Sequence, residues 1–415
     1  MKITRRSALI GTALAPLPRL ARAAGAPVTV EFTTWQLEEP GFGAWWSEVI
    51  DAFQAATPGV RIVKAQIPFR DYLDQLTIRF ASNRPPPLLE LPSDSLGAFA
   101  SQGWLAALDE RIKGTPIATD WSSLQQDLVW DGKTQGVLLM GYAFMMFYNA
   151  ALLDAAGVAL PTDWASFIAA VPKITQRDKG VFGLSAVTTE YPTIPLDFIR
   201  TAVWSGQHLT KGTTYALTEP GMVKALELYR SLVGGNAPLG DNSTIIRQLF
   251  VDGKTGFLVD GPWVWALLDK APPAVRPNLK MAKAPFPPAL GGASNSLHLA
   301  AGLDRATEDA AWSFVLFLAQ PQWQQRYTEL SAAPAARRDA LGAELAAKRP
   351  ELALINQSVL GAQSTTPDNQ LLRSNYTEFN HIIQRAAVQV ISTTTPVAKI
   401  LADTQAELER SVPLS

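Results

Sequence analysis

The sequence contains no cysteine among its 415 residues and only three histidines. Without cysteine there is no disulfide framework, no thiolate metal site and no lipid anchor on a cysteine that follows a cleaved leader. Three histidines are too few to favour a transition-metal site. We therefore expect neither a metal site nor a cofactor.

Common catalytic motifs are also missing. The chain has no Gly-x-Ser-x-Gly elbow, no His-Glu-x-x-His pair and no phosphate loop of the Gly-Lys-Ser type. No segment after the N-terminus approaches the roughly 20 apolar residues that a membrane span requires. No basic stripe interleaved with aromatic residues is present, which argues against a nucleic-acid partner. The sequence favours a protein that is neither an enzyme nor a membrane-spanning protein.

What is present is ordinary for a folded, water-soluble protein. Hydrophobic residues make up 47% of the chain and charged residues 18%, which is too apolar for a disordered chain. The chain is longer than a domain with a single hydrophobic core usually is, and its length suits two lobes. Two lobes provide a cleft between them.

The first 23 residues have the composition of an export signal. Arg5 and Arg6 stand in a basic head, residues 8–17 are weakly apolar, and residues 21 and 23 offer the small side chains that a signal peptidase recognises. The adjacent arginines resemble the twin-arginine type of signal. We expect residues 1–23 to be removed and the mature protein to be soluble in the periplasm without a lipid anchor; the alternative is a basic tail.

Strands and helices alternate in the first part of the chain. Residues 28–35 alternate apolar and polar side chains as a half-buried strand does, and residues 42–57 have helical spacing. A strand over 60–65, a helix over 72–81 and an apolar run over 87–91 follow. This alternation predicts a parallel α/β sheet, whose ligands bind beyond the carboxyl ends of the strands.

The middle of the chain carries a second set of expected elements. Residues 136–148 form an almost unbroken apolar strand that could pass between lobes. Thr162 is expected to cap the next helix. A strand is expected over 254–259. The Pro- and Gly-rich segment 272–292 is interpreted as a linker, and residues 297–301 as a short strand that crosses back.

Five motifs, each weak alone, occur in an order and spacing typical of one family. They are residues 96–105 (LGAFASQGWL), 147–153 (FYNAALL), 253–257 (GKTGF), 260–263 (DGPW) and 311–315 (AWSFV). With them, nearly the whole mature chain resembles the extracellular solute-binding proteins of ABC importers, in the group that includes the maltodextrin and glycerol phosphate receptors. A departure from that group is His298, near which the family usually shows Gly and Trp.

The resemblance implies a periplasmic binding protein of type II, with two α/β lobes, a hinge and a discontinuous chain. We place the N-terminal lobe at 27–141 plus 300–345 and the C-terminal lobe at 145–297 plus 346–415. The chain is expected to cross between lobes in three places: near 141–144, near 298–301 and near 345.

The resemblance also implies a function. The lobes would close on a small carbohydrate, such as a sugar, oligosaccharide or polyol, and deliver it unchanged to ABC permease subunits in the inner membrane; a monomer is expected. A glycerol phosphate receptor and a receptor that signals to a membrane sensor share this fold. From another class, a secreted glycan hydrolase would use two of Asp94, Glu190 and Asp260 as acid and base.

Aromatic side chains are expected to stack on the apolar face of a sugar ring. Trp263, in the Gly-Pro-Trp corner after a strand, resembles the stacking residue of the family. Trp35 ends the first strand and is assigned equally to the site and to the core. Tyr142 lies at the first crossing, and Trp204 is expected to line the cleft or to pack. Three tryptophans with helical spacing are expected in the core: Trp45, Trp46 and Trp312.

Polar side chains are expected to bind the hydroxyl groups. Ser93 and Asp94 lie in a loop where the family places ligand carboxylates, with helix capping as the alternative. Glu190 resembles an acid of the second lobe, with a solvated loop acid as the alternative. His298 is a candidate contact, although a lone histidine is more often part of the core. Residues 38–39, both glutamates, are expected to face solvent, with a ligand contact by one of them as the alternative.

Overall fold

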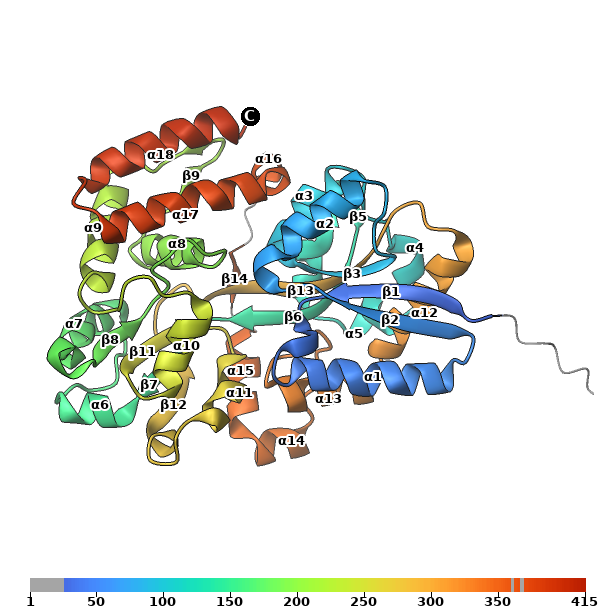
Figure 1. Cartoon of the computed structure of the whole chain (residues 1–415), viewed down its shortest axis with the longest axis horizontal. Helices are drawn as coiled ribbons and strands as arrows, with labels where there is room; N and C mark the ends of the chain where they lie inside the picture. Colours follow the sequence, from blue (N-terminus) through green and yellow to red (C-terminus); the bar gives the residue numbers. More distant parts are fainter. Residues whose placement is uncertain (1–25, 360–361, 366–368) are drawn as a thin grey trace, which may run out of the picture.

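The computed structural model describes residues 26–359, 362–365 and 369–415, so the export signal expected at 1–23 lies outside the described residues. The chain forms two lobes (Figure 1). Each lobe has its own cluster of buried hydrophobic residues, one around Phe32 in the N-lobe and one around Phe147 in the C-lobe. Separate cores are the mark of separate folding bodies within one chain.

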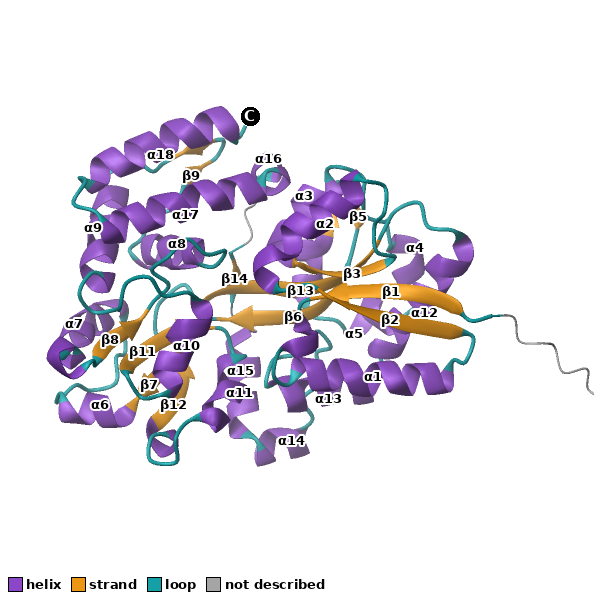
Figure 2. Ribbon diagram, viewed as in Figure 1, coloured by secondary structure: helices purple, strands orange, loops and turns teal. Residues whose placement is uncertain are grey.

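The N-lobe is built on a twisted α/β sheet. Strand β1 (Val28–Thr34) pairs in parallel with β2 (Val60–Gln66) on one side and β3 (Leu88–Pro92) on the other. Helices α1 (Phe42–Ala56) and α2 (Tyr72–Ala81) make the two connections, and helices cover both faces of the sheet (Figure 2). The predicted alternation of strands and helices is confirmed.

Aromatic side chains fill the N-lobe core. Phe32, Trp45 and Trp46 are fully buried, and the rings of Phe32 and Trp46 have centroids 4.5 Å apart. Trp312, on α12 (Arg305–Leu318), is 6% exposed in the same cluster. The helical spacing of these tryptophans correctly predicted core positions.

Two antiparallel strands connect the lobes. Strand β6 (Val137–Ala143) leaves the N-lobe and continues into β7 (Met145–Asn149) of the C-lobe, while β13 (Leu290–Leu299) returns beside β6 (Figure 1). From Asn295 onward, β13 pairs with β3 of the N-lobe. The return strand therefore begins well before the segment 297–301 in which we expected it.

The C-lobe sheet contains β7 between β11 (Thr255–Asp260) and β12 (Leu279–Lys283), with β8 (Phe182–Ser185) on the far side of β11. Interpretation of the whole segment 272–292 as a linker is therefore wrong. Its prolines flank β12, which lies at the edge of the sheet, where flanking prolines are tolerated.

The C-terminal helices complete the C-lobe. Helix α17 (Tyr376–Ser392) packs against α8 (Ile194–Trp204), α9 (Pro220–Val233) and α18 (Val397–Ser411). None of the helices in the described part of the chain combines the length and the apolar character needed to span a membrane.

A short helix, α16 (Gln370–Ser374), instead packs against α3 (Leu96–Ala100) of the N-lobe. The contact is close at Gly97, where a Cβ atom would lie 2.3 Å from the carbonyl oxygen of Arg373. The chain therefore links the lobes near its end as well as through β6 and β13.

Candidate functional site

Trp263 lies where the two lobes meet. It follows β11 in the Gly-Pro-Trp corner and begins α11 (Val264–Leu267). Its half-buried side chain packs against both hydrophobic cores. A Cβ atom on Gly261 would lie only 2.1 Å from the indole ring, so the glycine lets the ring fold back onto the backbone. Trp263 therefore contributes to the boundary between the lobes.

Two further aromatic rings surround Trp263 from the crossing strand. The ring centroid of Tyr142 lies 5.6 Å from that of Trp263 and 5.2 Å from that of Phe144. The hydroxyl of Tyr142 lies 3.3 Å from that of Thr365. The structure thus brings together two predicted residues, Tyr142 and Trp263, and adds Phe144.

Beside these rings is an ion pair. On α10 (Ser243–Val251), Arg247 donates hydrogen bonds to Asp260 from Nε (2.7 Å) and Nη2 (3.3 Å). Its guanidinium carbon lies 5.8 Å from the Trp263 ring centroid. This geometry holds a planar cation over an aromatic face.

A second ion pair lies deeper in the C-lobe. Asp197 and Arg200, both on α8, are paired, and their side chains are about nine-tenths buried. The guanidinium carbon of Arg200 lies 4.5 Å from the ring centroid of Phe144. Burial raises the pKa of Asp197, and the positive charge of Arg200 opposes that shift.

A cavity of about 40 Å³ lies among these side chains. Its polar lining includes both ion pairs and two hydroxyl residues, Thr193 and Ser243, and its apolar lining includes Phe144 and Trp263. About 15 Å³ accommodates one water molecule, so the cavity has room for a small polar group.

Metal ligands do not gather in the part of the chain that the structure describes. No group of three or more His, Asp and Glu side chains there could hold a metal ion. The acids near Trp263 are instead paired with arginines, Asp260 with Arg247 and Asp197 with Arg200.

The N-lobe contributes Glu39 to the same boundary. We expected this residue to face solvent, which is wrong: Glu39 is half-buried and interacts electrostatically with Arg247 of the other lobe. Burial raises the pKa of Glu39 to about 7, although Arg247 opposes the shift. Tyr191 and Arg70 belong to the same cluster, because both Arg70 and Glu39 influence the pKa of Tyr191, which burial raises.

Two other predicted residues are buried in the N-lobe. Trp35 is 6% exposed, and its ring centroid lies 5.5 Å from that of Phe69 and 4.9 Å from that of Tyr72. Ser93 is 1% exposed, with its hydroxyl oxygen 3.2 Å from that of Ser296. Both pack in the N-lobe in this arrangement. The side chain of Asp94 lies outside the described part of the protein.

His298 is fully buried in the N-lobe sheet. Its Nδ1 donates to the carbonyl oxygen of Gln135 at 2.6 Å, and its Nε2 lies 2.7 Å from the hydroxyl oxygen of Ser296. Burial lowers its pKa to about 4. Because both ring nitrogens have partners inside the lobe, we retain the core alternative for His298 and not the ligand contact.

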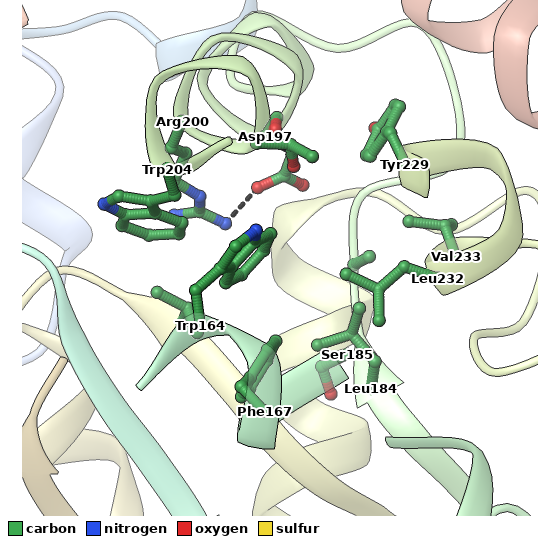
Figure 3. A pocket seen from close by; sticks show the side chains of 13 residues that line it. Trp164, Phe167, Leu184, Ser185, Asp197, Arg200, Trp204, Tyr229, Leu232 and Val233 are labelled. Carbon is green, nitrogen blue, oxygen red and sulfur yellow. Dashed lines mark hydrogen bonds and ion pairs between the residues drawn. The ribbon is translucent and has the colours of Figure 1, made fainter. Parts of the chain in front are cut away.

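The remaining two candidates are Glu190 and Trp204. Glu190 is exposed in the loop before α8. Trp204 is 8% exposed, donates from Nε1 to the carbonyl oxygen of Pro288 at 3.1 Å, and packs on Trp164 and Phe286. Trp204 also lines a second cavity of the C-lobe (Figure 3).

The sequence analysis missed both arginines, although a signal was available. Arg247 is the one charged residue of the apolar helix α10, and Arg200 follows Asp197 by three residues on α8. A charge in an apolar helix face is costly unless it is paired. An unpaired charge would therefore be unfavourable at either position, and the sequence could have identified Arg200 and Arg247 as members of buried ion pairs.

Residues 48–353 match the sequence profile of the bacterial extracellular solute-binding proteins. The chain belongs to this family. This solute-binding protein is similar to a binding protein of Brucella abortus, with 26% identity over 302 residues that cover 69% of this chain and 71% of that protein.

Solved structures of low sequence identity share the fold of this solute-binding protein. One is an ABC transporter solute-binding protein of Thermotoga lettingae bound with α-D-tagatose (TM-score 0.81, 19% identity, 94% of this chain and 100% of that chain). Another is UgpB of Mycobacterium tuberculosis in complex with glycerophosphocholine (TM-score 0.80, 20% identity, 93% and 98%). The predicted type II fold with two α/β lobes is confirmed.

Proposed function

We propose that this solute-binding protein is the periplasmic receptor of an ABC importer and that it captures a small neutral carbohydrate or polyol between its lobes. The observation that carries the proposal is the combination, at one boundary, of aromatic faces with charges that are already paired inside the protein. Family membership and the tagatose-bound neighbour support the same class of ligand.

The aromatic rings suit the apolar face of a sugar. A pyranose or polyol presents C–H groups that pack on flat rings. Of the three rings gathered here, the half-buried Trp263 is the most accessible, and Tyr142 lies against it. The indole Nε1 of Trp263 is buried and has no hydrogen-bond partner in the described part of the chain. A ligand hydroxyl would satisfy this donor.

The ion pairs suit the hydroxyl groups. A guanidinium has five N–H donors and a carboxylate about four acceptor positions, so each pair retains capacity after its own hydrogen bonds. Arg247 and Asp260 offer both kinds of group next to Trp263. A planar pair of this kind binds two neighbouring hydroxyls of a polyol, one as acceptor and one as donor.

The charge balance argues for a neutral ligand. Arg247 and Arg200 are matched by Asp260 and Asp197. A phosphate dianion would need cations that are not neutralised within the site. The same pairing disfavours the hydrolase, because Asp260 is bound to Arg247, and Glu190 is exposed.

The mechanism follows from the hinge. Contacts from both lobes stabilise the closed arrangement, and β6 and β13 are the segments on which the lobes turn. The bound molecule remains chemically unchanged and passes to the permease subunits. We expect the exported receptor to act as a soluble monomer.

The test is a binding screen on the purified mature protein. Maltose, D-tagatose, ribitol and glycerophosphocholine are compared by thermal shift and calorimetry, with chromatography for products. We expect at least one neutral sugar or polyol to raise the melting temperature without turnover. Stabilisation by glycerophosphocholine alone would favour the glycerol phosphate type of receptor, and product formation would contradict the receptor function.

Replacement of Trp263 by Ala tests the site itself. Loss of a stacking tryptophan should weaken binding by about 1–3 kcal/mol. The matched control is Trp323→Ala, because Trp323 packs on Phe317 in the N-lobe core, away from the boundary. Equal affinity of Trp263→Ala and wild type would place the indole in the core.

A further inference from the structure

A second cavity of the C-lobe, called the inner cavity below, adjoins the first. It measures about 30 Å³ and is lined by Trp164, Trp204 and Tyr229 (Figure 3). The two cavities share Asp197 and Arg200 as lining residues. The ion pair therefore lies between two adjacent cavities.

Two donors of the inner cavity lack partners. Trp164 Nε1 and the hydroxyl of Tyr229 are buried, and no group in the described residues forms a hydrogen bond with either. Tyr229 is only 1% exposed. Figure 3 shows the indole nitrogen of Trp164 turned toward the Asp197 carboxylate. A buried donor without an acceptor is costly, so this geometry calls for an acceptor in the cavity.

The size of the inner cavity limits what the acceptor can be. A volume of about 30 Å³ admits a water molecule or a single hydroxyl group and little more. An oxygen of this kind can accept a hydrogen bond from either donor and donate its own proton to Asp197, whose carboxylate also accepts from the backbone N–H of Val187 at 3.3 Å. A hydroxyl oxygen matches all of these groups, whereas an anion would face the Asp197 carboxylate.

Resting on the proposed function, we propose that the inner cavity is a subsite for one hydroxyl oxygen, bound by Trp164 and Tyr229. The oxygen belongs either to a bound water molecule or to a terminal hydroxymethyl arm of the ligand.

The first measurement is the melting temperature of ligand-free Tyr229→Phe. If the hydroxyl binds an oxygen, its removal lowers the melting temperature by about 1–3 °C. If the hydroxyl has no partner, its removal raises the melting temperature, because a desolvated group has been deleted. The matched control is Tyr215→Phe, since the hydroxyl of Tyr215 donates to the carbonyl oxygen of Val412 at 2.7 Å and its loss must be destabilising.

The second measurement is the affinity of Tyr229→Phe for whichever of maltose, D-tagatose and ribitol stabilises the wild type most. An affinity about fivefold to tenfold lower than that of wild type assigns the oxygen to the sugar. A lower melting temperature with unchanged affinity assigns it to water. Trp164→Phe should repeat the outcome, because it removes the other donor.

Failure of the subsite and failure of the proposed function would give different results. Unchanged affinity together with an unchanged or raised melting temperature in both variants overturns the subsite. Failure of all three sugars and polyols to bind the wild type overturns the proposed function, while the melting temperatures still report on the inner cavity.

Discussion

Glu39 lies between the lobes with a pKa of about 7, so the affinity for a ligand that closes the lobes is expected to change across neutral pH. Opening of the lobes returns Glu39 to water, where its ordinary pKa is 4.5. The charged and titratable groups that face it come from both lobes: Arg247 on α10, Tyr191 before α8, Glu90 on β3 and Tyr327 on α13 (Pro321–Ser331).

The direction of the change in affinity with pH follows from proton uptake by Glu39. A carboxyl group whose pKa is higher in the closed protein binds a proton on closure, so closure is favoured at low pH and weakens as the pH rises from 4.5 to 7. With pKa values of 4.5 and about 7 for the open and closed proteins, the affinity at pH 8 is about tenfold lower than at pH 6. Above pH 8 it should change little.

Calorimetric titrations at pH 6 and pH 8 check this prediction with the most stabilising sugar of the screen. Glu39→Gln carries no titrating proton and should bind with nearly equal affinity at both values. Glu38→Gln is the matched control, because Glu38 is the exposed neighbour and its replacement should leave the pH dependence intact. Equal wild-type affinity at pH 6 and pH 8 would refute the reasoning.

Two further predictions concern stability. His298 has a pKa of about 4 in the folded protein against an ordinary 6.5; the unfolded chain therefore binds the proton first, and about 3 kcal/mol of stability should be lost as the pH falls from 6.5 to 4. Denaturant titrations of His298→Gln should show a smaller loss over that range, and an unchanged loss would contradict the assignment. Asp260→Asn removes the carboxylate charge that faces the partly buried Arg247 and should lower the free energy of unfolding by about 1–3 kcal/mol. The double variant Asp260→Asn, Arg247→Met should recover much of this loss, and no recovery would argue against the pair.

Local patterns in the sequence predicted much of the fold. The alternation in 28–35 and the helical spacing of Trp45 and Trp46 report which face of an element is buried, and that face was correct. The first residue of a helix was harder to predict where two neighbouring residues can each act as its N-cap. Asp163, not Thr162, caps α7 (Trp164–Ile174), because Asp163 and Ser166 form a reciprocal capping box.

The candidate site was harder to predict because its partners are remote in the sequence. Glu39 and Arg247 meet only after the lobes are placed together, and no periodicity reports a partner on another lobe. His298 has a remote partner in the same way, since its Nδ1 is hydrogen-bonded to the carbonyl oxygen of Gln135. Trp263 and Tyr142 were predicted because the resemblance to the solute-binding proteins indicates which residues lie near each other in the folded protein. The periodicity of the sequence does not contain this information.

The fourth strand of the N-lobe sheet, β13, comes from a late part of the chain. The sheet can therefore be completed only after that part has been synthesised. Strand β3 has an unpaired edge until β13, which ends at Leu299, has been synthesised. An open strand edge pairs readily with other chains. A nascent or truncated polypeptide that stops before this strand is therefore expected to aggregate and to need a chaperone, whereas loss of the final helix α18 would spare the N-lobe.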